Sequence, residues 1–160
     1  MAIKSNLSII QSLNEQIDLL ENTVLQHVKI KPEFLSLLTI DGIGNILGMT
    51  IMLEIGNIYR FPSVGQFASY ARCVDSCRSS NGKTKGTNNR KNGNKYLSWA
   101  FVEAAHCIIR HNKTAHKFYQ RKRAQKNGAL ATKALAHKMA RAAYHVIRNQ
   151  EPFNMTLLFR

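Results

Sequence analysis

Residues 72–97, RCVDSCRSSNGKTKGTNNRKNGNKYL, separate two strongly apolar parts of the chain and therefore decide how it can fold. The stretch carries seven basic residues against one acid, and glycine, asparagine and serine recur within it. A segment this polar cannot supply a core, so its composition predicts a solvated loop. A loop of this length inside a compact domain is usually functional or disordered. We therefore expect an active loop that faces a polyanion.

Helical periodicity flanks this loop on both sides. Apolar residues recur at helical spacing, and no stretch alternates like a strand over a useful length. Glycine at positions 42 and 44 predicts a tight turn between two short helices, and Ser63 is a suitable N-cap for another. The sequence thus predicts an all-α fold, with a helix-hairpin-helix-like motif and a long basic loop. The expected helices lie in residues 3–28, 34–55 (two short helices), 63–71, 96–110, 113–126 and 129–149.

The N-terminal helix has a seven-residue apolar repeat. Isoleucine or valine occupies the a positions and leucine two of the d positions, namely Ile3, Ile10, Ile17, Val24, Leu13 and Leu20. This combination favours a parallel two-stranded coiled coil, so we expect a homo-oligomer through residues 3–28. An ordinary helix packed on the domain has the same pattern, and both interpretations stay open. The expected organisation is this helix in residues 1–31, a helical domain in 34–150 and a tail in 151–160.

Charge is divided unevenly along the 160 residues. Residues 1–60 hold four Lys or Arg and six Asp or Glu, whereas residues 61–160 hold nineteen and three. Such an excess of cations attracts polyanions, and we expect DNA rather than a membrane surface, because no helix sets a clean basic face against a bulky apolar one. Merely solubilising charge is the alternative. A polar N-terminus and no apolar run of spanning length predict a cytoplasmic protein.

Candidate phosphate contacts come from the glycine turn and from basic side chains. Gly42 and Gly44 would let a phosphate approach the amides from Asn45 onward, although Asp41 stands where such motifs usually have proline. In residues 113–126, Phe118 and Tyr119 would be aromatic anchors within a basic surface. The expected nucleic-acid-binding residues are Gly42, Gly44, Asn45, Arg78, Lys83, Lys85, Arg90, Lys91, Lys95, Lys117, Arg121 and Arg123.

Cysteine and histidine do not form a metal pattern. Cys73 and Cys77 lack the further ligands of a zinc site, and the six histidines show no ligand spacing, so we expect no metal in this chain. Glu54, inside an apolar run, can be a metal ligand, but an exposed or capped carboxylate is the plainer interpretation. Trp99 either anchors the core, which is the preferred interpretation, or stacks at the edge of a DNA molecule.

Four motifs follow one another in order: the turn at residues 42–44, EIGNIYRF at 54–61, SNGK at 80–83 and KNGNKYL at 91–97. Together they resemble the C-terminal domain of the IS110, IS116 and IS902 transposases, which are related to Piv-type DNA invertases. The resemblance runs from about Leu37 to about Ile147 without a gap. It implies an enzyme of DNA transposition and recombination in which Ser80 is the nucleophile. It also implies an N-terminal RuvC-like domain with four acidic ligands for Mg²⁺ and, in many members, a structured guide RNA.

The residues around Ser80 agree with that chemistry. A hydroxyl near Arg78, Lys83 and Lys85 can attack a phosphodiester while the cations stabilise the developing charge. Ser79 and Ser76 lie close by, and spacing alone does not choose among the three. The chain has no acidic tetrad, so we expect the metal-bearing domain elsewhere and the chain alone to be inactive, as one part of a split or truncated transposase.

Two other classes of function stay open. One is a non-catalytic nucleic-acid-binding architectural module, or a remnant of a truncated transposase. The other is an interaction protein in which residues 3–28 dimerise and the basic face is incidental.

Overall fold

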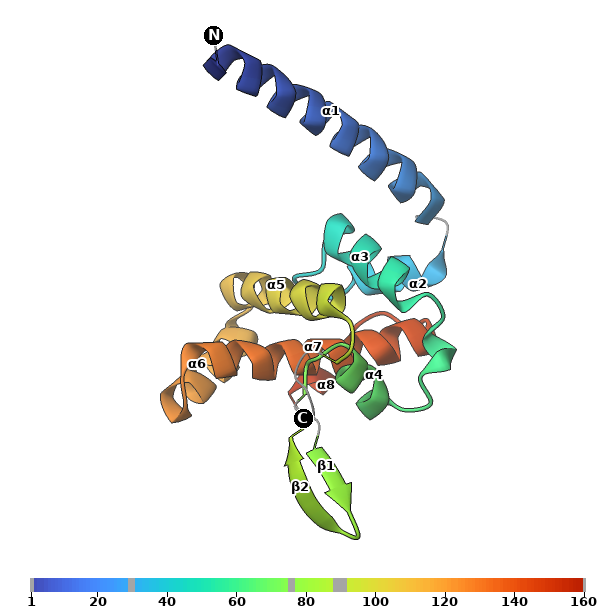
Figure 1. Ribbon diagram of the computed structural model, residues 1–160. Helices are drawn as coiled ribbons and strands as arrows, with labels where there is room; N and C mark the ends of the chain where they lie inside the picture. The colour runs from blue at the N-terminus through green and yellow to red at the C-terminus, as the bar shows by residue number, and fades with distance from the viewer. Residues whose placement is uncertain (1, 29–30, 75–76, 88–91, 160) are drawn as a thin grey trace.

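The computed structural model describes residues 2–28, 31–74, 77–87 and 92–159, and within them one short hairpin interrupts an otherwise helical chain (Figure 1). The all-α class is confirmed. The elements in chain order are α1 (Ala2–Val28), α2 (Pro32–Leu38), α3 (Asn45–Ile55), the 3-10 turn η1 (Ile58–Arg60), α4 (Val64–Tyr70), β1 (Cys77–Ser80), β2 (Lys83–Thr87), α5 (Lys95–His111), α6 (Lys113–Gln125), α7 (Gly128–Asn149) and α8 (Met155–Leu158).

Helix α7 is the element on which the others pack. Helices α2, α4, α5 and α6 all contact it, and Figure 1 shows α5 and α6 lying along its length. Alanines such as Ala136, Ala140 and Ala143 are buried on α7 and permit close approach of its neighbours. Leu135 and Met139 are fully buried between them, each contributing about 1.5–3 kcal/mol of hydrophobic free energy.

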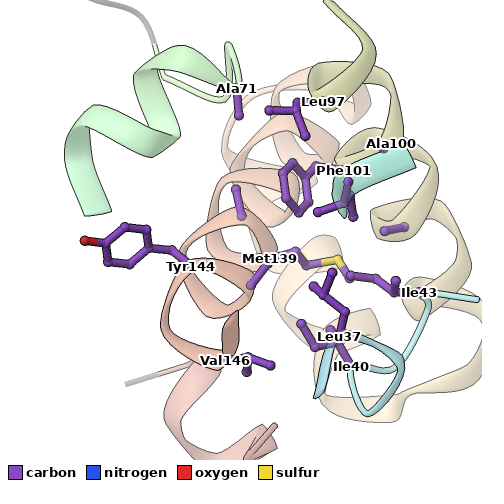
Figure 2. Packing of buried hydrophobic residues seen from close by; sticks show 14 of the residues in the cluster. Leu37, Ile40, Ile43, Ala71, Leu97, Ala100, Phe101, Met139, Tyr144 and Val146 are labelled. Carbon is purple, nitrogen blue, oxygen red and sulfur yellow. The ribbon is translucent and has the colours of Figure 1, made fainter. Parts of the chain in front are cut away.

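Helix α5 meets α7 through the apolar stripe that its sequence predicts. Figure 2 shows Met139 of α7 with Phe101 of α5 above it and Leu37 of α2 below it. The expectation that Trp99 anchors this core is wrong, because its side chain is 48% exposed. Trp99 lies two residues from the buried Leu97, which is about 200° around the helix and therefore off the buried stripe.

The glycine turn between α2 and α3 packs against α5. Gly42 has φ +92°, and a Cβ there would lie 2.7 Å from the carbonyl oxygen of Ala104. The neighbouring Asp41 accepts a hydrogen bond from the side-chain amide of Asn112 (3.1 Å). Close contact with α5 thus accounts for the need for glycine at position 42, whereas Gly44 is exposed.

Helix α1 extends away from the helical body (Figure 1). Its C-terminal turns touch the body through Val24, Leu25 and the buried Val28. Only this C-terminal end of α1 therefore packs on the domain, as the interpretation of residues 3–28 as an ordinary packed helix predicts. The apolar side chains of the preceding turns are exposed, namely Ile3, Leu7, Ile9, Ile10, Leu13, Ile17, Leu19 and Leu20.

The C-terminal residues return to the body. Leu158 of α8 is buried, and the ring of Phe159 lies 5.2 Å from that of Phe118 on α6. The segment expected as a tail, residues 151–160, thus contributes Leu158 to the core, with Phe153, Met155 and Phe159 packed against it. Of the helices that the structure describes, none combines the length and the apolar character needed to span a membrane.

The contact of Gly42 with α5 is testable by substitution. Gly42→Ala should lower the free energy of unfolding by about 1–3 kcal/mol, because it adds a strained positive φ and an overlap with Ala104. Gly44→Ser is the matched control, since a Cβ at Gly44 meets nothing within 4 Å and serine is a good N-cap for α3. Urea denaturation measures both, and equal stability of the two variants would contradict this packing.

Candidate functional site

The basic loop contains an antiparallel hairpin that the sequence did not predict. Strand β1 pairs with β2, and Asn81 and Gly82 form the turn with φ +53° and +71°. Positive φ at both central residues is the type I′ arrangement, which suits the twist of paired strands and favours Asn-Gly. The expectation of no strand is therefore wrong in this segment. Apart from Cys77, the strands are built from polar residues and glycine, so the alternation of apolar and polar residues that reveals a strand is missing.

Ser80 is exposed beside this turn, directly opposite Lys83. Directly opposite residues have Cβ atoms about 4.5–5.5 Å apart on one face of the hairpin, so the lysine stem starts on the side of the Ser80 hydroxyl. The register shifts between Arg78 and Ser79, which leaves the exposed Lys85 as the extra residue of β2. Figure 1 shows the turn at the far end of the hairpin, away from the helices.

Several expected residues of the loop fall outside what the structure describes. Ser76, Arg90 and Lys91 lie outside the described residues. For Arg78 and Ser79 the backbone is described and the side chain is not. Their assignments remain predictions from the sequence.

The two ends of the loop are held together at the base of the hairpin. The Arg72 guanidinium donates through Nε and Nη2 to the carbonyl oxygen of Gly93 (3.0 and 2.7 Å). The backbone N–H of Asn94 donates to the carbonyl oxygen of Tyr70 (2.6 Å). Gly93 has φ +97°, and a Cβ on it would overlap the Tyr70 carbonyl oxygen. Glycine at this position thus permits the two backbones to touch. We call the contacts among Glu54, Tyr70, Arg72, Gly93 and Asn94 the loop clamp.

Asn94 joins the loop clamp to two helices. Its Oδ1 accepts from the backbone N–H groups of Tyr96 (2.8 Å) and Leu97 (3.0 Å), which makes it the N-cap of α5. Its Nδ2 donates to Oε2 of Glu54 on α3 (2.5 Å). The sequence favoured an exposed or capped carboxylate at Glu54, whereas its side chain is half-buried and accepts this hydrogen bond. Among the described residues, His, Cys, Asp and Glu side chains form no group of three that could hold a metal.

Tyr70 and Arg60 complete the surroundings of Asn94. Hydrogen bonding by the side chain of Asn94, and next by that of Arg60, lowers the pKa of the Tyr70 phenol. The Arg60 guanidinium lies 4.6 Å from the ring centres of both Phe61 and Tyr70. The EIGNIYRF and KNGNKYL motifs, far apart in the sequence, therefore meet at the base of the hairpin.

Behind the loop clamp lies a cavity of about 470 Å³ between α5, α6 and α7. Cys73, at the start of the loop, lines it and is itself buried. Burial raises the pKa of the Cys73 thiol to about 12, against an opposing effect of Lys133. The thiol therefore stays protonated at neutral pH.

The basic residues expected on the helices are exposed. Lys95 opens α5, where its ammonium lies 4.8 Å from the ring centre of Tyr96. The expectation that Phe118 anchors a ligand is wrong, because Phe118 is buried against Phe159, while Tyr119 is half-buried. The three cations that the sequence predicted as nucleic-acid contacts on α6 are exposed, namely Lys117, Arg121 and Arg123.

Comparison with known proteins gives one family. The model of the Transposase IS116/IS110/IS902 family matches residues 35–120, a range that contains the hairpin and all residues of the loop clamp. A search of curated proteins finds no match to the chain.

Removing the side chain of Asn94 tests the loop clamp. Asn94→Ala should lower the free energy of unfolding by about 1–3 kcal/mol, because α5 loses its N-cap and Glu54 its partner. It should also raise the pKa of Tyr70, whose largest lowering contact is Asn94. Urea denaturation and an ultraviolet pH titration measure the two effects. The adjacent exposed Lys95→Ala should change neither, and an Asn94→Ala chain with both properties unchanged would contradict the assignment.

Proposed function

The chain belongs to the IS116/IS110/IS902 family of transposases, and from this premise we propose that it binds DNA and presents Ser80 as the nucleophile of strand cleavage and rejoining. The observation that carries the proposal is the place of Ser80, exposed at the turn of a basic hairpin and opposite Lys83. A nucleophile at the end of a projecting element can reach a phosphodiester that the helical body does not touch.

The proposed chemistry is a transesterification. Oγ of Ser80 loses its proton and attacks phosphorus, the bond from phosphorus to one strand oxygen breaks, and that oxygen takes up a proton as it leaves. The product is a phosphoserine linkage, and attack by a strand hydroxyl reverses the step and rejoins the DNA. Lys83, on the same face as Ser80, would stabilise the charge that develops on the phosphate oxygens, and the exposed Lys85 adds to the local positive field.

Cations on the helices would hold the DNA backbone while the hairpin acts. Lys95, Lys117, Arg121 and Arg123 are exposed and suited to phosphate contacts, which position a nucleic acid without reading its sequence. Gly44 and Asn45, exposed at the start of α3, offer backbone amides to a phosphate. Gly42 is not part of this proposed phosphate contact, because it packs closely against α5. A structured guide RNA would meet the same positive surface.

The resemblance also implies Mg²⁺ in a RuvC-like domain. The described residues of this chain do not fit such a site, since their acidic side chains do not gather. We propose that the metal-bearing domain acts alongside these residues, and that the 160 residues alone bind DNA without recombining it.

We further propose that α1 forms a homo-oligomer. The apolar a and d positions from Ile3 to Leu20 are exposed, so a single chain leaves an apolar seam facing water. A second copy of the helix would cover that seam by knobs-into-holes packing. Oligomerisation would bring two hairpins into one assembly, as joining two DNA strands requires.

A non-catalytic architectural module is the alternative that the same surface supports. Its affinity would come from the same cations, and Ser80 would have no role in it. The catalytic proposal and the architectural alternative differ only in whether the Ser80 hydroxyl attacks a phosphodiester.

The contribution of the hairpin to DNA binding is testable through salt. Combining Lys83→Ala with Lys85→Ala should reduce the slope of log affinity against log salt concentration by about 2, because two phosphate contacts are lost. Ser80→Ala should leave affinity and slope unchanged. Fluorescence anisotropy with a labelled duplex measures both quantities.

The matched control combines Lys4→Ala with Lys31→Ala, which removes two exposed cations outside the hairpin. An equal loss of slope in the control and hairpin variants would contradict a specific contact at the hairpin. Strand cleavage by the purified chain, lost on Ser80→Ala, would contradict the proposal that these residues do not recombine DNA alone.

Substitution of two neighbouring leucines of similar exposure tests the oligomer. Leu20 occupies a d position and is 64% exposed, whereas Leu19, at 60%, lies off the seam. Leu20→Asp should shift the sedimentation coefficient towards the monomer, because it buries a charge in the seam. Leu19→Asp should leave it unchanged, and a monomeric chain before any substitution would overturn the proposal.

A further inference from the structure

Asn-Gly pairs occur at three places in the chain: residues 81–82, 92–93 and 127–128. In such a pair the glycine nitrogen can attack the side-chain amide carbon of the asparagine, since glycine has no Cβ to hinder the approach. The reaction needs the asparagine side chain and the following backbone to rotate towards each other. The three pairs share this chemistry and differ in what holds them.

The pair at residues 127–128 is held by a helix cap. Oδ1 of Asn127 accepts from the backbone N–H of Leu130 (2.9 Å), and its carbonyl oxygen accepts from Ala131 (3.0 Å). Ring closure at Asn127 would remove the N-cap of α7, the helix on which the others pack. The fold therefore opposes reaction at this pair.

The pair at residues 92–93 is held by the loop clamp. The carbonyl oxygen of Gly93 accepts from Arg72, and the next residue, Asn94, donates to Tyr70. Gly93 also lies against the Tyr70 backbone. Rotation of Gly93 towards Asn92 would break these contacts, so the clamp opposes reaction here as well.

The pair at residues 81–82 lacks such restraints. Asn81 and Gly82 are both exposed, and a Cβ built on Gly82 meets nothing within 4 Å. Among the described residues, no hydrogen bond holds the Asn81 side chain. We propose that Asn81 is a site of spontaneous deamidation that alters the hairpin tip while the rest of the fold stays intact.

Water is the only other reactant that the deamidation needs. The Gly82 nitrogen attacks Cγ of Asn81 and gives up its proton, the bond from Cγ to Nδ2 breaks, and ammonia leaves. Water then opens the resulting succinimide to aspartate or isoaspartate. Either product carries a negative charge where the neutral amide stood, and isoaspartate also adds one backbone atom to the two-residue turn.

The consequence rests on the proposed function. The new carboxylate would be on the residue next to Ser80 and two residues before Lys83, where a DNA phosphate is expected. It would repel the phosphate and pair with the lysine, so deamidated protein should bind DNA several-fold more weakly at low salt.

The test is incubation of the folded full chain in warm, mildly alkaline buffer, followed by peptide mapping with mass spectrometry. Asn81 should convert several times faster than Asn92 and Asn127, and in urea the three rates should approach one another. Asn81→Gly, which keeps a sequence suited to the type I′ turn, is the unreactive control. Faster conversion at Asn92 or Asn127 in the folded chain, or an unchanged Asn81, would overturn the proposal.

A measurement of DNA binding distinguishes a failure of the deamidation proposal from a failure of the proposed function. Asn81→Asp should weaken binding relative to Asn81→Gly. If Asn81 deamidates and the product binds DNA as before, the modification site stands and the placement of the hairpin tip against DNA is contradicted.

Discussion

The hydrogen bonds of Asn94 are the interaction on which the arrangement of this chain depends. One side chain caps α5, holds Glu54 of α3 and lies beside Tyr70 of α4, while its backbone closes the loop. A polar insertion in mid-chain would otherwise separate the two halves of the core. Because Asn94 and Arg72 bring its ends together, the insertion leaves the body as a hairpin and α5 can pack on α7.

This arrangement separates the core that stabilises the fold from the hairpin in which we propose the chemistry takes place. The helical body is stabilised by apolar burial along α7 and by close backbone contacts at Gly42 and Gly93. The hairpin carries almost no apolar surface, so its residues are free to serve a ligand. Ser80 at the tip gains cations from its own strands, and the body contributes cations on α5 and α6.

The sequence predicted most of the helices, because their apolar stripes have the right period and their caps are conventional. Ser63, for example, caps α4 as expected. It could not predict the hairpin, whose strands lack alternation, although Asn81-Gly82 is the dipeptide that type I′ turns favour. The loop clamp was also missed as a unit, since Glu54 and Asn94 are forty residues apart and only the fold joins them. Trp99 and Phe118 were misplaced because residue type alone does not tell which helix face is covered.

The proposed function requires the hairpin tip to lie against a DNA phosphate. The most direct measurement is disulfide cross-linking between a Ser80→Cys chain, its native cysteines replaced by alanine, and duplex DNA that carries a thiol tethered to one backbone phosphate. Efficient cross-linking is expected at position 80, and little at Ser8→Cys on α1, where the native serine is also exposed. Equal yields at the two positions, or none at position 80 under conditions where DNA is bound, would contradict it.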